Sequence, residues 1–151
     1  MTRTEPPLTE LYLEDEVAWL DAMVDRLRAG AYADLDYASL TEFLTDMAIS
    51  ERREVENRLA VLLAHILKWL YQPDRRSNSW RATIIEQRQK LNRRVGRGVL
   101  RNHALASLAD CYADAVEVAA AEAGLPAEAF PAACEYTLAE LLAFDPAAPG
   151  A

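Results

Sequence analysis

The segment from Val55 to Tyr71 constrains the fold more than any other part of the sequence. Its apolar residues follow one another so closely that a helix formed by the segment has almost no polar face; they are Leu59, Val61, Leu62, Leu63, Ile66, Leu67, Trp69 and Leu70. A helix that is apolar all round is one that other elements of the protein surround. The sequence therefore predicts a central helix, buried by its neighbours.

The composition favours helices throughout the chain. Ala and Leu, both strong helix formers, make up 49 of the 151 residues, as 28 Ala and 21 Leu. Five Gly, seven Pro and two Cys are too few for a collagen-like chain or a disulfide framework. A chain of this length buries roughly 70% of the surface that its unfolded form exposes. We therefore expect an all-α fold, a compact single-domain helical bundle of about five to six helices.

The first helix is predicted from Glu10 to Ala29, with Gly30 placed to end it. Its apolar residues recur three or four positions apart, so that they share one face of the helix. They are Leu13, Val17, Leu20, Val24 and Leu27. We expect this face to pack against the rest of the bundle.

The remaining helices are predicted from caps and breaks. A second helix, capped by Asp36 or Ser39, reaches Ser50, where a break or kink is expected, and the central helix ends at Gln72-Pro73. A later helix is capped at 77–79, with Trp80, Ile84, Leu91 and Val95 expected to point inward. Another begins at Asn102 or in the turn before it and ends at Gly124, with inward residues Leu105, Leu108, Tyr112, Ala115, Val116 and Ala119. A short last helix is expected from Thr137 to Ala143. The helical domain is thus expected at 10–144, between a flexible N-terminus at 1–9 and a flexible tail at 145–151.

Charge is segregated along the chain. Residues 1–51 hold 12 acidic and 3 basic residues, residues 52–101 hold 4 and 13, and residues 102–151 hold 8 and none, so the net charges are −9, +9 and −8. One interpretation is that the basic helices lie between acidic ones and pair with them. The alternative is a nucleic-acid-binding protein that uses the basic segment Arg75 to Arg101. The candidate anion surface is then formed by Lys90, Arg93, Arg94 and Arg97, although no helix-turn-helix, RNP or zinc-finger pattern accompanies it.

Location is inferred from three features. The start MTRTEPPLTE lacks the basic and apolar runs of a signal peptide, and the apolar stretch Leu59 to Leu67 is shorter than the roughly 20 residues of a membrane span. Cys111 and Cys134 lie in different segments without a C-x-x-C pattern, so free thiols are expected. We expect a cytoplasmic protein without a membrane partner, and the sequence leaves its oligomeric state open.

Catalytic motifs do not stand out. If the second and central helices pack together, His65 could meet the carboxylates of Glu42 and Asp46 in an acid/base cluster, the weaker alternative of an enzyme. A hydrogen-bonded histidine in the core is the stronger interpretation. Neither a metal-ligand spacing, a phosphate loop nor a nucleophile turn is present. We therefore assign no catalytic residue, metal or cofactor.

The densest group of aromatic and basic side chains lies at a helix–turn–helix corner, residues 65–88, called the corner below. Aromatic and arginine side chains are typical of interaction hot spots. The candidate interaction residues are His65, Lys68, Trp69, Tyr71, Gln72, Arg75, Arg76, Ser79, Trp80, Gln87 and Arg88. In the alternative interpretation, the aromatic residues only staple the two helices together. The leading hypothesis is a non-catalytic protein-interaction or regulatory module whose partner is a protein.

The same segment carries a family resemblance. HILKWLYQPDRRSNSWRATIIEQR, residues 65–88, resembles the signature of the bacterial family called domain of unknown function twenty-nine, and the resemblance extends from about Tyr12 to Leu142. Further landmarks are Trp19, LRAG at 27–30, SERR at 50–53, GLP at 124–126 and YTL at 136–138. Phe43 and Thr45 depart from the pattern, which usually has glutamates there. The resemblance implies a compact α-helical fold and no established activity, substrate or cofactor.

Overall fold

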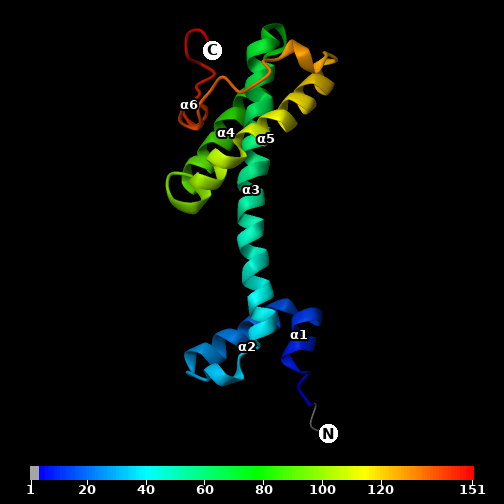
Figure 1. Ribbon diagram of the computed structural model, residues 1–151, viewed down its shortest axis with the longest axis vertical. Coiled ribbons are helices and arrows are strands. Elements are labelled where there is room, and N and C mark those ends of the chain that lie inside the picture. The colour runs from blue at the N-terminus through cyan, green and yellow to red at the C-terminus, as the bar shows by residue number, and fades with distance from the viewer. Residues whose placement is uncertain (1–3) are drawn as a thin grey trace. The chain divides into compact units, whose positions relative to one another are not determined.

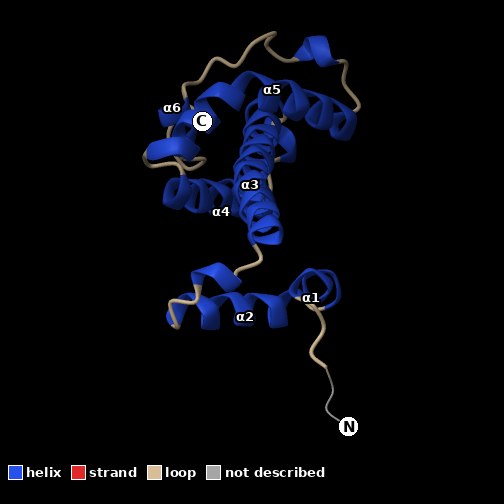
Figure 2. Cartoon of the chain, turned by 60° about the horizontal axis from the view of Figure 1, so that its bottom comes forward, coloured by secondary structure: helices blue, strands red, loops and turns tan. Residues whose placement is uncertain are grey.

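The computed structural model describes residues 4–151, and in this range the chain forms helices and loops without a strand (Figures 1 and 2). The predicted all-α fold is confirmed. By its internal contacts the chain divides into two compact units, a first unit that ends at Ile49 and a second unit at Ser50–Ala151.

The first unit begins with two helices where one was predicted. α1 spans Leu8–Glu14 and α2 spans Glu16–Arg28, so the expectation of a single helix over 10–29 was wrong. Asp15 separates them with φ −147° and ψ 86°, and its carboxylate accepts a hydrogen bond of 3.0 Å from the backbone N–H of Ala18. Aspartate is a strong N-cap, and capping requires the non-helical backbone that interrupts the run.

The core of the first unit uses a different face of α2 from the one predicted. Trp19 and Met23 are its buried apolar residues, whereas Leu13, Val17, Val24 and Leu27 are exposed. The indole Nε1–H of Trp19 donates to Asp36 at 3.2 Å, and its ring lies 4.7 Å from Tyr12 and 5.7 Å from Phe43, between ring centroids. Tryptophan has more apolar surface to bury than valine or leucine, so α2 turns Trp19 inward and leaves the leucine–valine stripe outside.

One long helix, α3 at Tyr37–Tyr71, replaces the two helices expected between Asp36 and Tyr71. The break predicted near Ser50 is absent, since helical residues continue through this position. No Gly or Pro occurs between 37 and 71, and a polar run without them lacks the residues that usually interrupt a helix.

The second unit packs around the C-terminal half of α3, as predicted for a central helix. α4 at Asn78–Arg94 and α5 at Gly98–Ala123 lie beside α3, and the short α6 at Leu138–Leu142 contacts both α4 and α5 (Figure 1). Fully buried residues from all four helices form one core; examples are Leu59, Leu62, Ile84, Leu91, Ala119 and Leu141. The all-round apolar pattern was therefore a correct signal of burial for most of the segment, but not for Val61, which is 38% exposed.

Caps fix three helix ends of the second unit where the sequence placed them, whereas α5 begins at Gly98, in the turn before Asn102, without a side-chain cap. The Ser77 hydroxyl accepts from Trp80 N–H at the start of α4, and Thr137 and Glu140 form a capping box at the start of α6. Gly124 ends α5 with φ +65°, and Leu125 N–H donates to Ala120 at 3.0 Å. In the expected tail at 145–151, Ala151 packs against the core.

Candidate functional site

The corner is held by a buried lysine. Lys68 is 5% exposed, and its ammonium lies 2.6 Å from a carboxylate oxygen of Glu122 on α5. The same Nζ lies 5.0 Å from the ring centroid of Trp80 on α4. A buried ammonium is stabilised by a nearby counter-charge, and the face of an aromatic ring adds a cation–π attraction. Lys68 has both. Lys68 therefore fastens α3 to α4 and α5.

Arg76, in the turn of the corner, contacts both the backbone and the ring of Trp69. Its Nε–H donates to the carbonyl of Trp69 at 2.9 Å, and its guanidinium lies 4.7 Å from the centroid of the Trp69 ring. Because Trp69 is buried, this arrangement matches the interpretation in which aromatic residues staple the two helices. Tyr71, Arg75, Arg76 and Ser79 remain exposed. The corner as an interaction surface stays a prediction, and these four residues are the ones that can carry it.

Other corner residues also contact their own protein. Gln87 accepts a hydrogen bond of 3.2 Å from Arg58, and Arg88 donates to the carbonyl of Phe144 at 2.6 Å. Gln72 is half-buried, and its amide nitrogen has no hydrogen-bond partner among the described residues. Gln87 and Arg88 thus connect α4 to α3 and to the segment that follows α6.

His65 does not meet the carboxylates proposed for an acid/base cluster. The cluster required two helices packed against each other, but Glu42, Asp46 and His65 all lie on the single helix α3. Side chains on one helix meet only when they are three or four residues apart, so the premise of the enzyme alternative was wrong. Instead the His65 Nδ1 lies 2.9 Å from the carbonyl oxygen of Val61, and burial lowers the pKa of the imidazole.

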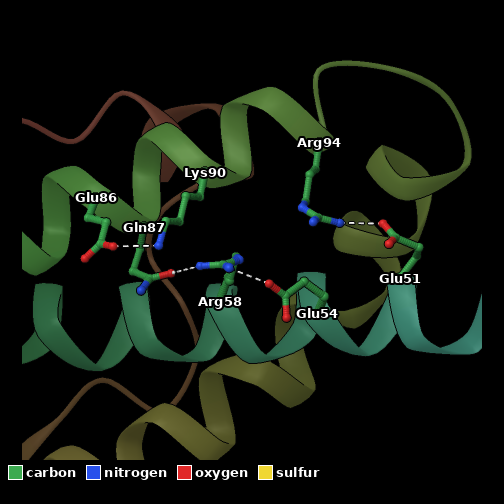
Figure 3. Close-up of polar contacts among 7 residues, drawn as sticks. All are labelled: Glu51, Glu54, Arg58, Glu86, Gln87, Lys90 and Arg94. Carbon is green, nitrogen blue, oxygen red and sulfur yellow. Dashed lines mark hydrogen bonds and ion pairs between the residues drawn. The ribbon is translucent and has the colours of Figure 1, made fainter.

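Several basic side chains of α4 are paired within the second unit (Figure 3). Arg94 pairs with Glu51 on α3, and Lys90 pairs with Glu86 at 2.6 Å. Arg58 on α3 reaches Glu54 at 2.5 Å. The Arg94–Glu51 pair joins the basic segment to the acidic segment before it, as the first interpretation of the charges expects, whereas the other two pairs lie within the basic segment 52–101. Arg93 and Arg97 are exposed, and the anion surface that they would share stays a prediction.

The second unit has an open apolar groove that sequence reasoning missed. It has a volume of about 870 Å³ and lies between α5 and the segment 127–134. The wall from α5 is formed by Leu105, Leu108, Ala109, Tyr112, Ala113 and Val116. Leu105 was predicted to point inward and is 50% exposed, so that prediction was wrong. The sequence did contain a signal of this groove, because α5 carries more apolar residues than a single buried face of a helix requires.

The opposite wall of this α5 groove is pinned to the helix. The Tyr112 hydroxyl donates to the carbonyl of Pro131 at 2.6 Å, which holds the segment 127–134 across α5. Phe130 and Cys134 line this wall, and Glu128 is the only carboxylate among the described lining residues. Burial raises the pKa values of the Tyr112 phenol and the Cys134 thiol, so both side chains are neutral at pH 7. The groove is thus apolar, with one carboxylate, Glu128, in its lining.

The corner and the α5 groove adjoin each other. The ring of Tyr71 lies 5.4 Å from the ring of Phe130, edge to face, and Phe130 lines the groove. Leu67, Leu70 and Tyr71 also enclose a small void together with Pro131 and Tyr136. The exposed Tyr71 therefore stands beside the wall that covers one side of the groove.

The described residues offer no reactive thiol pair and no metal-ligand cluster. Cys111 and Cys134 are free, as predicted, and burial raises the pKa of the Cys111 thiol to about 11. Within residues 4–151, no three His, Cys, Asp or Glu side chains come together as metal ligands. None of the helices described in that range is both long and apolar enough to cross a bilayer.

The architecture defines an all-α protein with a buried central helix and an apolar groove on its surface. Over residues 11–145 the sequence matches the family described as domain of unknown function DUF29, so the chain belongs to the DUF29 family. The resemblance expected from residues 65–88 is confirmed. Neither the curated proteins nor the solved structures include a match.

Proposed function

We propose that this protein is a non-catalytic protein-interaction module, and that the α5 groove holds an amphipathic helix of its partner. The observation that carries the proposal is the groove itself. The groove has a volume of about 870 Å³, and its walls are mainly apolar side chains that the rest of the protein does not cover. Exposed apolar surfaces of this kind mark interaction sites. The regulatory character of such a module is part of the proposal.

The shape of the groove favours a helix as its occupant. The wall that α5 provides extends from Leu105 to Val116, about three turns or roughly 16 Å. A helix that lies in an apolar groove uses side chains at positions i, i+3 or i+4 and i+7, which span two turns. The groove therefore matches the reach of one such anchor set.

The charge around the groove favours a basic partner. Residues 102–151, which include all the lining residues, hold eight acidic and no basic residues. Glu128 lines the groove, and Asp110 and Glu117 are exposed on α5. Complementary charge accelerates association and selects among partners with similar apolar faces. We therefore expect lysine or arginine residues on both sides of the partner's apolar stripe.

The corner lies beside the groove and would add contacts to the partner helix. Tyr71 is exposed next to Phe130, and Lys68, paired with Glu122 on α5, ties the corner to the same helix. A partner helix that leaves the groove at this end would contact Tyr71, an aromatic residue of the type enriched in hot spots.

The proposal is tested with model peptides. The probe is a fluorescent helical peptide with leucine at anchor spacing and lysine on its flanks, and binding is followed by fluorescence anisotropy. Leu105→Asp should weaken binding by at least about tenfold, because it places a charge in the apolar wall. Val118→Asp is the matched control, since Val118 is 48% exposed on the same helix and lies outside the groove, compared with 50% for Leu105.

Equal affinities of the two variants would contradict the proposal. A second peptide keeps the leucines and replaces lysine with glutamate, and it should bind at least about tenfold more weakly than the basic peptide at low salt. If the acidic peptide binds as well as the basic one, the choice of a basic partner is wrong. Circular dichroism of both variants checks that their helix content is unchanged.

A further inference from the structure

The apolar stripe of α2 has the pattern of a helix-pairing seam. Val17, Leu20, Val24 and Leu27 alternate three and four residues apart, with valine and leucine in turn. This spacing is that of the a and d positions of a coiled coil. Val17 is 67% exposed, Val24 and Leu27 are also exposed, and Leu20 is half-buried.

The core of the first unit is formed by a different face of α2 from the apolar stripe. Trp19 and Met23 point into its core, and they are the buried apolar residues of described residues 4–49. Units of this size bury too little surface to be more than marginally stable alone, and association commonly supplies the rest. The seam is thus an apolar surface that the first unit leaves uncovered and that would gain from a cover.

The charges on α2 select the occupant and its direction. Glu14, Asp15 and Glu16 stand at its start, and Arg26 and Arg28 stand with Asp25 in its last turn, so the start is acidic and the end has one net positive charge. An antiparallel copy of the same helix places the acidic end of each α2 against the basic end of the other. A parallel copy would align like charges at both ends, and it would also align the helix dipoles. Charge complementarity therefore favours a second copy in antiparallel orientation.

We propose that two copies of this chain associate through α2, with the two helices antiparallel. Val17 of one copy then faces Leu27 of the other, and Leu20 faces Val24, so that each layer pairs a valine with a leucine. Glu16 of one copy and Arg28 of the other then stand at the same level along the seam but on opposite flanks, so the attraction acts between the acidic and basic ends of the two helices and not through a direct ion pair. The interface is distinct from the α5 groove and does not depend on the proposed partner.

The association is tested by analytical ultracentrifugation at protein concentrations from about 1 µM to about 1 mM. The wild-type chain should sediment as a dimer in the upper part of this range, and Val17→Glu should weaken the dimer by at least about tenfold. Val99→Glu is the matched control, since Val99 is 63% exposed and, like Val17 in α2, is the second residue of its helix, α5. Glutamate in the first turn of a helix is favourable, so both variants should fold.

The direction is tested by charge reversal. Arg28→Glu should weaken the dimer, and the addition of Glu16→Arg in the same chain should restore it, since the antiparallel pair then again has opposite charges at each end. A chain that stays monomeric throughout overturns the proposal, as does a dimer that Val17→Glu leaves intact. A double variant that remains as weak as Arg28→Glu overturns the antiparallel arrangement. Leu105→Asp in the α5 groove should leave the dimer unchanged, which separates this proposal from the proposed function.

Discussion

Lys68 and Glu122 show how single residues hold the second unit together. They are 54 positions apart in sequence, and their side chains meet at 2.6 Å, where Lys68 is buried and Glu122 is half-exposed. Removing a carboxylate from a buried ammonium leaves a charge that has lost its water and its partner. The loss is smaller than for a fully buried pair, because solvent screens the exposed side of Glu122.

We expect Glu122→Gln to lower the free energy of unfolding by about 1–2 kcal/mol, measured by urea denaturation. Glu117→Gln, on the exposed surface of the same helix, should change it by less than about 0.5 kcal/mol. Equal effects of the two substitutions would show that the pair with Lys68 does not stabilise the fold.

At the scale of elements, α5 depends on how it ends. Gly124 has φ +65°, and the backbone N–H groups of Gly124 and Leu125 close the last turn. Only glycine adopts this left-handed conformation without a steric penalty. The end of α5 sets where the segment 127–134 begins, and this segment is one wall of the groove.

Gly124→Ala should therefore lower the melting temperature, with a loss of about 1 kcal/mol. No heavy atom lies within 4 Å of the added Cβ, so the cost is one of backbone conformation alone. Gly96→Ala is the control, because Gly96 has no positive φ and its added Cβ would make only an ordinary contact of 3.6 Å with the Asn92 carbonyl. It should leave stability unchanged or raise it slightly. If Gly124→Ala is as stable as Gly96→Ala, the cap is not a determinant of the fold.

At the scale of the whole molecule, the two units bury very different amounts of apolar surface. The described part of the first unit buries Trp19 and Met23, whereas the second unit buries a continuous core from four helices. Local opening costs less free energy where fewer apolar contacts must be broken. The two units should therefore differ in stability within one chain.

Native-state hydrogen exchange measures this difference. The amides of α2 should exchange at least about tenfold faster than those of α3 between Val55 and Leu70 at low protein concentration. If the α2 seam pairs two copies, protection of α2 should rise with concentration, while protection of 55–70 stays constant. Uniform protection across both units would contradict the expected difference.

Local chemistry determined the parts of this fold that the sequence predicted well. The apolar pattern of 55–71 marked the helix that the core surrounds, although Val61 and Tyr71 are exposed, and Ser77 and Gly124 act on the few residues around them. The family resemblance likewise rests on a contiguous segment. These features depend on neighbours in sequence, so the order of residues was sufficient.

Tertiary structure alone decided which of several apolar faces is buried, because that depends on residues far apart in the sequence. The stripe of α2 and the Trp19 face were both apolar, and only packing against Tyr12 and Phe43 showed which one is buried. The surplus apolar face of α5 became a groove because the segment 127–134 crosses it. Burial is a property of the folded surroundings, so periodicity can identify an apolar face but not what covers it.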